Sequence, residues 1–137
     1  DVESRGLGDV YKRQLLAFTN ARLKKGVDII INYTNLKEIV QKADIVFTGE
    51  GGIDFQTQYG KTPFGVARTA KAADKTVIAI AGYIGEGIEQ LYSMGFDAIL
   101  GIVPGAMTIG EAMMKGAENV ERTVENIVRL LNSRGKI

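Results

Sequence analysis

Apolar residues in the central part of the chain form short runs, each followed by a glycine-bearing polar stretch. The runs at 45–47, 76–81 and 98–103 are rich in β-branched or aromatic residues, which predicts three buried strands. Helical spacing follows at 63–73 and 86–94. Successive strand–loop–helix units form parallel sheets with right-handed crossovers, which brings their loops to one edge. The pattern therefore predicts an α/β fold with a parallel sheet.

The segment before the first strand has a mixed pattern. Apolar residues stepping by four predict a helix over 15–25, and a lysine pair followed by Gly26 predicts its end. The β-branched run 27–31 predicts a short strand. Asn35 with Glu38 resembles a capping pair, so a further helix is expected from residue 36 into the first central strand.

The C-terminal region predicts a long helical segment. Thr108 with Glu111 forms a capping box, and apolar residues hold helical spacing from there to Leu131, with Gly116 as a break. The methionines of this region are expected to fill the core: Met107, Met113 and Met114. Its charged face is expected to be solvated, with pairs such as Glu125–Arg129: Glu118, Glu121, Arg122, Glu125 and Arg129.

The stretch between the first central strand and its helix carries most of the candidate chemistry. Gly49, Gly51 and Gly52 are expected to end the strand and to let the backbone approach a ligand closely. Thr62 followed by Pro63 predicts a helix start with Thr62 at the N-cap. Polar side chains are concentrated within twelve residues: Glu50, Asp54, Gln56, Thr57 and Lys61.

A parallel α/β sheet binds ligands at this place, beyond the carboxyl end of a strand and before a helix N-terminus. Two carboxylates suit a divalent cation, and an ammonium group suits a phosphate. On residue type alone, however, Glu50 and Asp54 are more often caps of the turn's own N–H groups. Lys61 precedes a helix whose dipole opposes a cation, so an anion is its natural partner. A P-loop is excluded because Phe55 stands where the glycine five residues before Gly60 is required.

The composition limits the kinds of partner and of catalysis that the chain can have. With 137 residues, 45% hydrophobic and 24% charged, the chain suits one globular domain. A net charge of +1 provides no field that recruits nucleic acid or an anionic membrane. The absence of Cys and His excludes disulfides, thiolate catalysis and the commonest general base. No apolar run approaches the length of a membrane span and no signal peptide is evident, so a cytoplasmic location is expected.

The segment TGEGGIDFQTQYGKTPFGVA, Thr48–Ala67, resembles the signature of the bacterial glycerate kinase family. The similarity continues through VIAIAGYIG, FDAILGIVPGAMTIGEAM and AENVERTVENIVRLL. It runs from about Leu15 to the C-terminus, which corresponds to about the last third of a family member. The resemblance implies a Rossmann-like (flavodoxin-like) sheet with flanking helices, present here as a partial domain. Many members carry a basic residue at the position of Gly52, so a charge contact made there is missing.

The resemblance also implies an activity. Family members transfer the γ-phosphoryl group of ATP to a hydroxyl of D-glycerate, with Mg²⁺, at a site between two α/β domains. The expected partners are therefore ATP and D-glycerate, and neither nucleic acid nor membrane. Two alternatives stay open. One is a non-catalytic α/β domain that holds an anion or other ligand at the same loops, and the other is a kinase fragment that is inactive alone.

The resemblance makes a direct role for the two carboxylates the preferred interpretation over capping. It implies catalysis by Asp54, Lys61 and Glu50, with Asp54 and Glu50 also as metal ligands. Substrate-binding residues are expected at four positions: Gln56, Thr57, Gly49 and Gly51. Nucleotide-binding glycines are expected in the later loops, although ordinary turn glycines would look the same: Gly82, Gly85 and Gly105.

Three sections are expected along the chain. Residues 1–14 are expected to be an artefactual or disordered leader, because 4–14 resembles a translated sequencing adapter; a real N-terminal arm is the alternative. Residues 15–43 are expected to return from a second domain. Residues 44–137 are expected to form the C-terminal part of the Rossmann-like domain.

Overall fold

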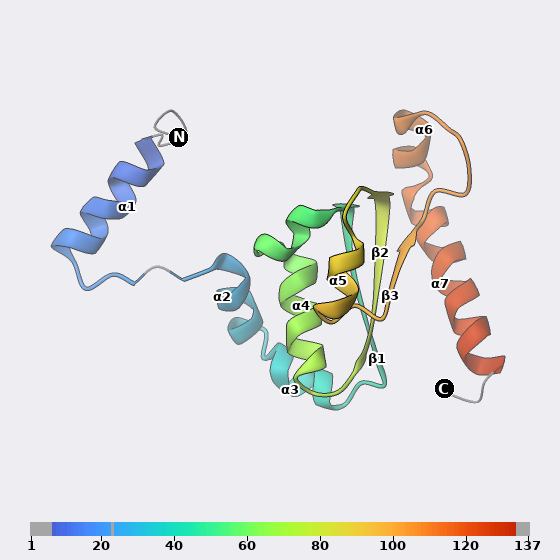
Figure 1. The fold of residues 1–137 in the computed structure, drawn as a ribbon, viewed down its shortest axis with the longest axis horizontal. Helices are drawn as coiled ribbons and strands as arrows, with labels where there is room; N and C mark the ends of the chain where they lie inside the picture. Colours follow the sequence, from blue (N-terminus) through green and yellow to red (C-terminus); the bar gives the residue numbers. More distant parts are fainter. Residues whose placement is uncertain (1–6, 23, 134–137) are drawn as a thin grey trace.

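The computed structural model describes residues 7–22 and 24–133 and contains a three-stranded parallel sheet (Figure 1). The strands are β1 (Ile45–Ile53), β2 (Thr76–Ile84) and β3 (Ala98–Gly101), in the order β1-β2-β3. The predicted α/β fold with a parallel sheet is confirmed, and all three strands end at the same edge.

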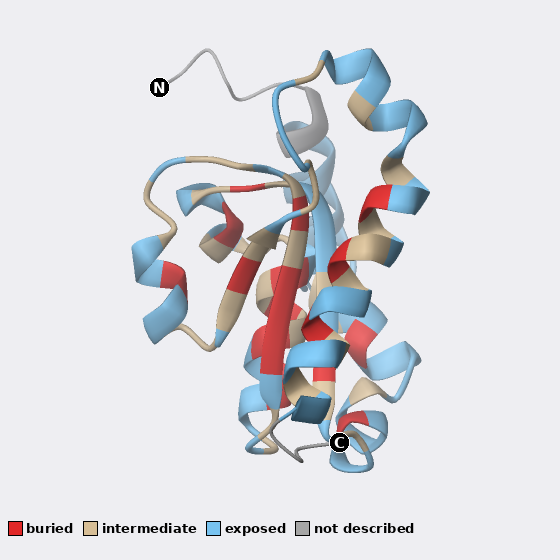
Figure 2. Cartoon of the chain, turned by 90° about the vertical axis from the view of Figure 1, so that its right-hand side faces the viewer, coloured by how far each residue is buried: buried red, intermediate tan, exposed pale blue. Residues whose placement is uncertain are grey.

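Helices lie on both sides of this sheet (Figures 1 and 2). Helix α4 (Thr62–Lys71) packs on one face with the shorter α5 (Glu89–Ser93), and α7 (Gly116–Ser133) lies on the opposite side. The main core lies under α4 and α5, where small residues of α4 allow close approach. Its fully buried members include Ala67, Ala70, Val77, Ala79 and Leu91. No helix within 7–22 and 24–133 combines the length and apolarity that a bilayer crossing requires.

Residues 27–31 form part of helix α2 (Gly26–Tyr33), so the predicted strand is wrong. Val27 and Ile31 are one helical turn apart and pack together on Gly65 of α4. A Cβ placed at Gly65 would lie 2.3 Å from Val27 Cγ2 and 3.2 Å from Ile31 Cδ1. This helix–helix contact is possible only at helical spacing, and it outweighs the strand preference of β-branched residues.

Strands β1 and β2 continue through the glycines that were expected to end them. The pairing keeps one register from Ile45 with Thr76 to Ile53 with Ile84, and it includes Gly49 with Ile80 and Gly52 with Tyr83. The glycines are used for close packing within the sheet, since a Cβ at Gly82 would lie 3.0 Å from the Gly51 carbonyl oxygen. Glu50 therefore projects from a strand, and the polar loop begins at Asp54 instead.

The N-terminal helix lies earlier than predicted. Helix α1 (Leu7–Phe18) ends where the Thr19 hydroxyl donates to the Leu15 carbonyl and accepts from the Ala21 N–H. The expected helix to residue 25 is thus wrong; residues 1–6 and 23 lie outside the described part. Every side chain described over 10–22 is exposed, and α1 stands away from the sheet (Figure 1).

Two capping predictions have opposite outcomes. Asn35 makes no side-chain cap for α3 (Leu36–Gln41), because it adopts a left-handed turn with φ 52° that Asn tolerates. The Thr108–Glu111 capping box is confirmed at α6 (Ile109–Met114), with Thr108 N–H donating to Glu111 Oε2 at 2.9 Å. The predicted break before Gly116 is also confirmed.

The C-terminal helices expose more apolar surface than predicted. Met113 and Met114 are 77% and 81% exposed, so their assignment to the core is wrong. The reason is that α6 stands beyond the end of the sheet, with no described element on its outer side (Figure 1). Arg122 also differs from the expected solvated residue, because it is half-buried and donates to the Ile102 carbonyl at 2.6 Å. The Glu125–Arg129 pair is confirmed.

Candidate functional site

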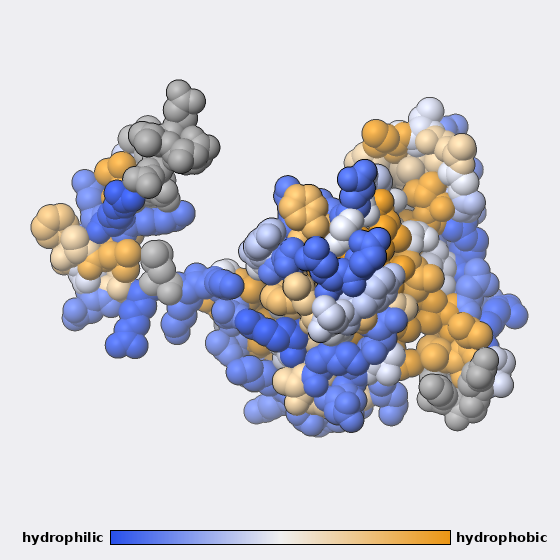
Figure 3. Space-filling model, in the orientation of Figure 1, coloured by the Kyte–Doolittle hydropathy of each residue, from blue (hydrophilic) through white to orange (hydrophobic). Residues whose placement is uncertain are grey.

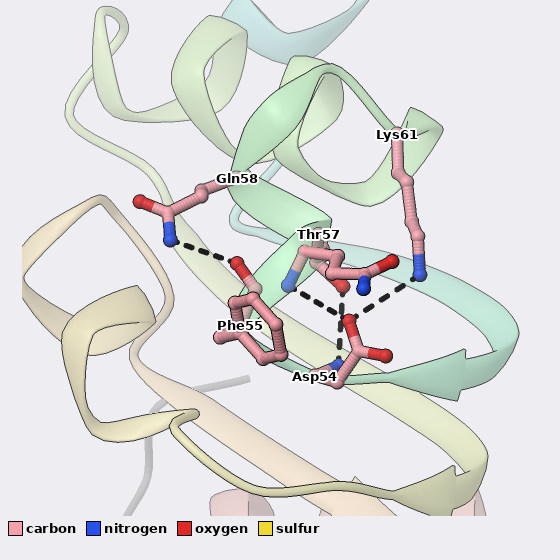
Figure 4. Close-up of polar contacts among 6 residues, drawn as sticks. Asp54, Phe55, Thr57, Gln58 and Lys61 are labelled. Carbon is pink, nitrogen blue, oxygen red and sulfur yellow. Dashed lines mark hydrogen bonds and ion pairs between the residues drawn. The ribbon is translucent and has the colours of Figure 1, made fainter. Parts of the chain in front are cut away.

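Asp54 stands where β1 ends and caps a short 3-10 helix, η1 (Phe55–Tyr59) (Figure 4). Its Oδ1 accepts from the Gln56 N–H at 2.8 Å, and its own N–H donates to Thr57 Oγ1 at 3.3 Å. Thr57 is fully buried. The capping interpretation is therefore present in the structure, and the cap holds the carboxylate in a defined orientation.

Lys61 approaches the same carboxylate from the start of α4. Its Nζ lies 3.5 Å from Asp54 Oδ1, and about one third of each side chain is exposed (33% and 32%). Lys61, rather than the predicted Thr62, occupies the N-cap position. Within the described residues Asp54 Oδ2 has no hydrogen-bond partner. The pair thus presents one free carboxylate oxygen beside an ammonium group, at the helix N-terminus.

The loop after β2 lies directly against Asp54. The Gly85 N–H donates to the Ile53 carbonyl at 2.8 Å, and the Phe55 N–H donates to the Glu86 carbonyl at 3.1 Å. A Cβ at Gly85 would lie 2.9 Å from Asp54 Cβ. Gly85 is therefore required for the close approach of the two loops, and this brings a predicted nucleotide-binding residue to a predicted catalytic one.

A cavity of about 820 Å³ opens beside the same strand ends. Three predicted site residues line it, namely Glu50 and Gly51 from β1 and Gly82 from β2. Asp54 and Lys61 are not among its lining residues. The structure thus divides the predicted acidic and basic residues between the cavity and the adjacent η1–α4 junction.

The remaining predicted residues have different surroundings. Gln56 is exposed on η1 and its N–H serves the Asp54 cap. Close packing of the two strands explains the glycine at position 49, because a Cβ there would lie 3.1 Å from the Ile80 carbonyl oxygen. Gly105 is exposed in the loop after β3, with nothing within 4 Å of the place of a Cβ. Of these, only Gln56 is in direct contact with the Asp54–Lys61 pair.

The carboxylates suit a magnesium ion only in part. In 7–22 and 24–133 no cluster of three or more His, Cys, Asp or Glu residues is placed to hold a metal. Mg²⁺ usually needs one or two carboxylates, however, because substrate phosphates and water complete its octahedron. Glu50 and Asp54 fit that limited role as donors, and they do not form a protein-only metal site.

Sequence reasoning missed the apolar wall of the cavity. Its lining includes Ile102, Val103, Met107, Ile109 and Met113, from the end of β3 to α6. Their spacing predicts core residues, because an apolar stripe in the sequence does not show whether its packing partner is present. The cluster of methionines beside a glycine-bearing strand end is the signal that indicates an adaptable binding surface.

The chain is similar in sequence to glycerate kinases. The Glycerate kinase family model matches residues 12–132. The chain is 45% identical over 127 residues to the glycerate kinase of Bacillus subtilis (strain 168), covering 93% of this chain and 33% of that protein. It is 36% identical over 131 residues to the glycerate 2-kinase of Escherichia coli (strain K12), covering 96% and 34%.

A crystal structure under the name of glycerate kinase 2 from Salmonella typhimurium LT2 has the same fold. It matches with a TM-score of 0.66 and 34% identity, covering 90% of this chain and 30% of that chain. The chain therefore spans about a third of the length of the curated relatives it matches.

Proposed function

The chain belongs to the glycerate kinase family, and we propose that it carries part of the active site of an ATP-dependent glycerate kinase. The reaction transfers the γ-phosphoryl group of ATP to a hydroxyl of D-glycerate, giving a phosphoglycerate and ADP. The observation that carries the proposal is the Asp54–Lys61 pair, held at the carboxyl end of β1 and the N-terminus of α4. That position is where α/β sheets bind phosphorylated ligands.

Asp54 is the proposed general base. As the glycerate hydroxyl oxygen bonds to the γ-phosphorus, the bond from phosphorus to the β–γ bridging oxygen breaks, and the hydroxyl proton passes to Asp54 Oδ2. Oδ1 of the same carboxylate is held by the hydrogen bonds from the Gln56 N–H and Lys61 Nζ. Oδ2 is therefore oriented before the substrate binds. Positioning of this kind supplies much of the rate of phosphoryl transfer.

Lys61 is the proposed electrostatic partner of the transferring group. Its ammonium is close enough to Asp54 to neutralise the carboxylate at rest, and a phosphoryl oxygen arriving at the helix N-terminus gives it a second anion. Mg²⁺, held by phosphate oxygens and by one of the two carboxylates, Glu50 or Asp54, would neutralise charge on the nucleotide. Fully buried Thr57 acts through the Asp54 cap rather than on the substrate.

The remaining predicted residues complete the proposal. Gln56 is exposed beside the pair and Gly51 is exposed at the cavity, and both suit the substrate carboxylate and hydroxyls. Gly49 supports the same strand. Gly82 near the end of β2, and Gly85 and Gly105 in the loops after β2 and β3, stay proposed nucleotide contacts. Because ATP and small organic acids are cytoplasmic metabolites, we place the enzyme in the cytoplasm.

The test uses a joined protein, in which this chain is fused to the portion of the Bacillus subtilis glycerate kinase that it does not span. Asp54→Asn and Lys61→Ala are expected to lower its kcat by at least about 100-fold while the unfolding transition is retained. Unchanged turnover would remove both residues from the mechanism. ATP binding without any turnover in the unmutated joined protein would support the non-catalytic binding domain instead.

The chain alone is expected to show no turnover with ATP, Mg²⁺ and D-glycerate. The reason is that it supplies one side of a site that family members build between two domains. Robust phosphoglycerate formation by the purified 137-residue chain would refute this expectation.

A further inference from the structure

The segment that leaves the sheet after β3 is held at its two ends. Strand β3 ends at Gly101, and the Ile102 N–H still donates to the Ala81 carbonyl at 2.9 Å. Residues 103–107 make no hydrogen bond with any part of the chain that the structure describes, and the next bonded residue is Thr108 in the capping box of α6. The course of this segment therefore depends on how its two ends are fixed.

Arg122 of α7 fixes the first of these ends. Its Nη2 donates to the Ile102 carbonyl at 2.6 Å. Ala81 with Gly101 is the last pair between β2 and β3, and within the described residues no backbone N–H donates to the Ile102 carbonyl. A guanidinium group thus takes the place of the strand partner that this carbonyl lacks. Such a charge-assisted hydrogen bond is stronger than one between neutral groups.

The surroundings of Arg122 strengthen this contact. The side chain is half-buried, and none of the ion pairs formed by the described residues includes it. Figure 3 shows hydrophobic side chains gathered between the body of the molecule and the hydrophilic outer side of α7, the region that Arg122 crosses to reach Ile102. A hydrogen bond in apolar surroundings is electrostatically stronger than one in water. Arg122 is therefore committed to the backbone and not to a surface carboxylate.

Asn119 orients the guanidinium group from one turn earlier in α7. Its Oδ1 accepts from Arg122 Nη1 at 3.3 Å. Asn119 is 2% exposed, and its Nδ2 is buried without a partner among the described residues. An unpartnered buried donor lowers stability, and an apolar side chain at this position would avoid that loss. The contact with Arg122 is the feature of the structure that explains an amide here.

We propose that Arg122 is a positioning residue for ATP, and that it holds segment 103–107 where Gly105 contacts the nucleotide. The segment borders the cavity beside the strand ends, because Ile102 lines this cavity together with Gly82. Arg122 is not among the lining residues, so it acts through the backbone of Ile102 and not on the ligand. The inference rests on the proposed function for the identity of the ligand.

The proposal separates nucleotide binding from phosphoryl transfer. Asp54 and Lys61 are held by η1 and α4, and neither element contains Arg122 or Ile102. Loss of Arg122 would therefore leave the proposed base and its ammonium partner in place. We expect it to weaken ATP binding through the segment after β3 and to leave the chemical step almost unchanged. Comparison of KM with kcat distinguishes these two effects.

The joined protein is used for the kinetic test. Arg122→Ala is expected to raise the KM for ATP at least about fivefold, while kcat and the KM for D-glycerate change by less than about twofold. Arg129→Ala is the matched control, because Arg129 lies on the same helix, is 73% exposed and pairs with Glu125; it should leave all three constants unchanged. An unchanged KM for ATP in Arg122→Ala would overturn the proposal.

Chemical rescue gives a further readout on the same variants. Guanidinium ion, added at a millimolar concentration far below that which unfolds proteins, is expected to restore part of the ATP affinity of Arg122→Ala. It should have no effect on Arg129→Ala. Rescue of this kind requires a vacated site that accepts a guanidinium group beside the Ile102 carbonyl. Equal KM values for ATP with and without guanidinium ion would count against the proposed contact.

Asn119→Leu distinguishes positioning from a general loss of stability. This substitution keeps the branching of the side chain but removes both the acceptor that orients Arg122 and the unpartnered amide. It is expected to raise the KM for ATP at least about twofold while the urea midpoint stays equal or rises. A merely structural role would raise KM only where the urea midpoint falls. Such a correlation across Arg122→Ala and Asn119→Leu would overturn the proposal.

Amide hydrogen exchange in the 137-residue chain tests the same contact without a nucleotide. Exchange of the Ile102 N–H is expected to be at least about tenfold faster in Arg122→Ala, because the end of β3 opens more often. The Val77 N–H, bonded to Asp97, is the control and should not change. Equal exchange of Ile102 would overturn the inference even where the joined protein is an active kinase. Failure of the unmutated joined protein to bind ATP would instead overturn the proposed function, and with it the role of Arg122 toward ATP.

Discussion

Lys71 and Asp97 lie 26 positions apart in the sequence and form an ion pair, with Lys71 Nζ 2.8 Å from Asp97 Oδ1. Asp97 Oδ2 accepts from the Val77 N–H at 2.7 Å. One carboxylate therefore joins α4, the start of β2 and the residue that precedes β3. Burial raises the pKa of Asp97, but the hydrogen bonds from Lys71 and Val77 and the charge of Lys71 outweigh it, so this pKa lies below its ordinary value.

The lowered pKa of Asp97 predicts acid sensitivity. A folded-state pKa below the unfolded value of about 3.9 means that the contribution to stability is complete above that pH and is lost as the pH falls through the folded pKa. Asp97→Asn is expected to cost about 1 kcal/mol or less at pH 7, because the pair is partly solvated. The difference in unfolding free energy between the unmutated chain and Asp97→Asn, measured by urea unfolding, should shrink below about pH 4. A difference that grows toward low pH would contradict the assignment.

Asp54 allows capping to be separated from catalysis. Asp54→Ala removes the cap of η1 and is expected to destabilise the chain by about 1 kcal/mol, whereas Asp54→Ser keeps an acceptor and should cost a few tenths. In the joined protein both substitutions remove the carboxylate, so both should abolish turnover. Urea unfolding and a coupled kinase assay measure the two effects. Turnover retained by Asp54→Ser would mean that Asp54 acts only as a cap.

Replacing Gly65 by alanine is expected to destabilise the fold, although alanine usually stabilises a helix. Gly65→Ala would place a Cβ 2.3 Å from Val27 Cγ2, so it is expected to destabilise the chain by about 1–2 kcal/mol although Ala is the better helix former. Val27→Ala should recover part of this loss. Gly110→Ala in α6 is the matched control, since nothing lies within 4 Å of its Cβ position, and it should stabilise by about 0.5–1 kcal/mol. Thermal melts of the four proteins test the series.

The capping box at the start of α6 is expected to control the pKa of Glu111. The N–H of Thr108, and then its hydroxyl, lower the pKa of Glu111 by hydrogen bonding to the carboxylate. Thr108→Val keeps the N–H and should raise this pKa in part, while Thr108→Pro removes the N–H as well and should raise it further. An NMR titration of the Glu111 side chain measures both shifts. An equal pKa in all three proteins would show that the box is open in solution.

The sequence predicts which segment carries the candidate site, but it does not predict how the side chains of the site are arranged in space. Asp54 and Lys61 are seven residues apart, and the strand and helix signals on either side place them at one loop. Gly85 could not be connected to Asp54 from the sequence, because their contact depends on the pairing of β1 with β2. Glu50 was assigned to a loop, and the continuing ladder places it on a strand.

Local interactions explain what the sequence determined by itself. The three parallel strands, helix α4 and the Thr108–Glu111 box were predicted because strand periodicity and capping depend on residues close together in the chain. Only the tertiary structure decided three further features: α2 is a helix because Val27 packs on Gly65, the strands run through their glycines because neighbours pair with them, and Met113 is exposed. The physical reason is that each depends on a distant partner, which residue type and spacing do not reveal.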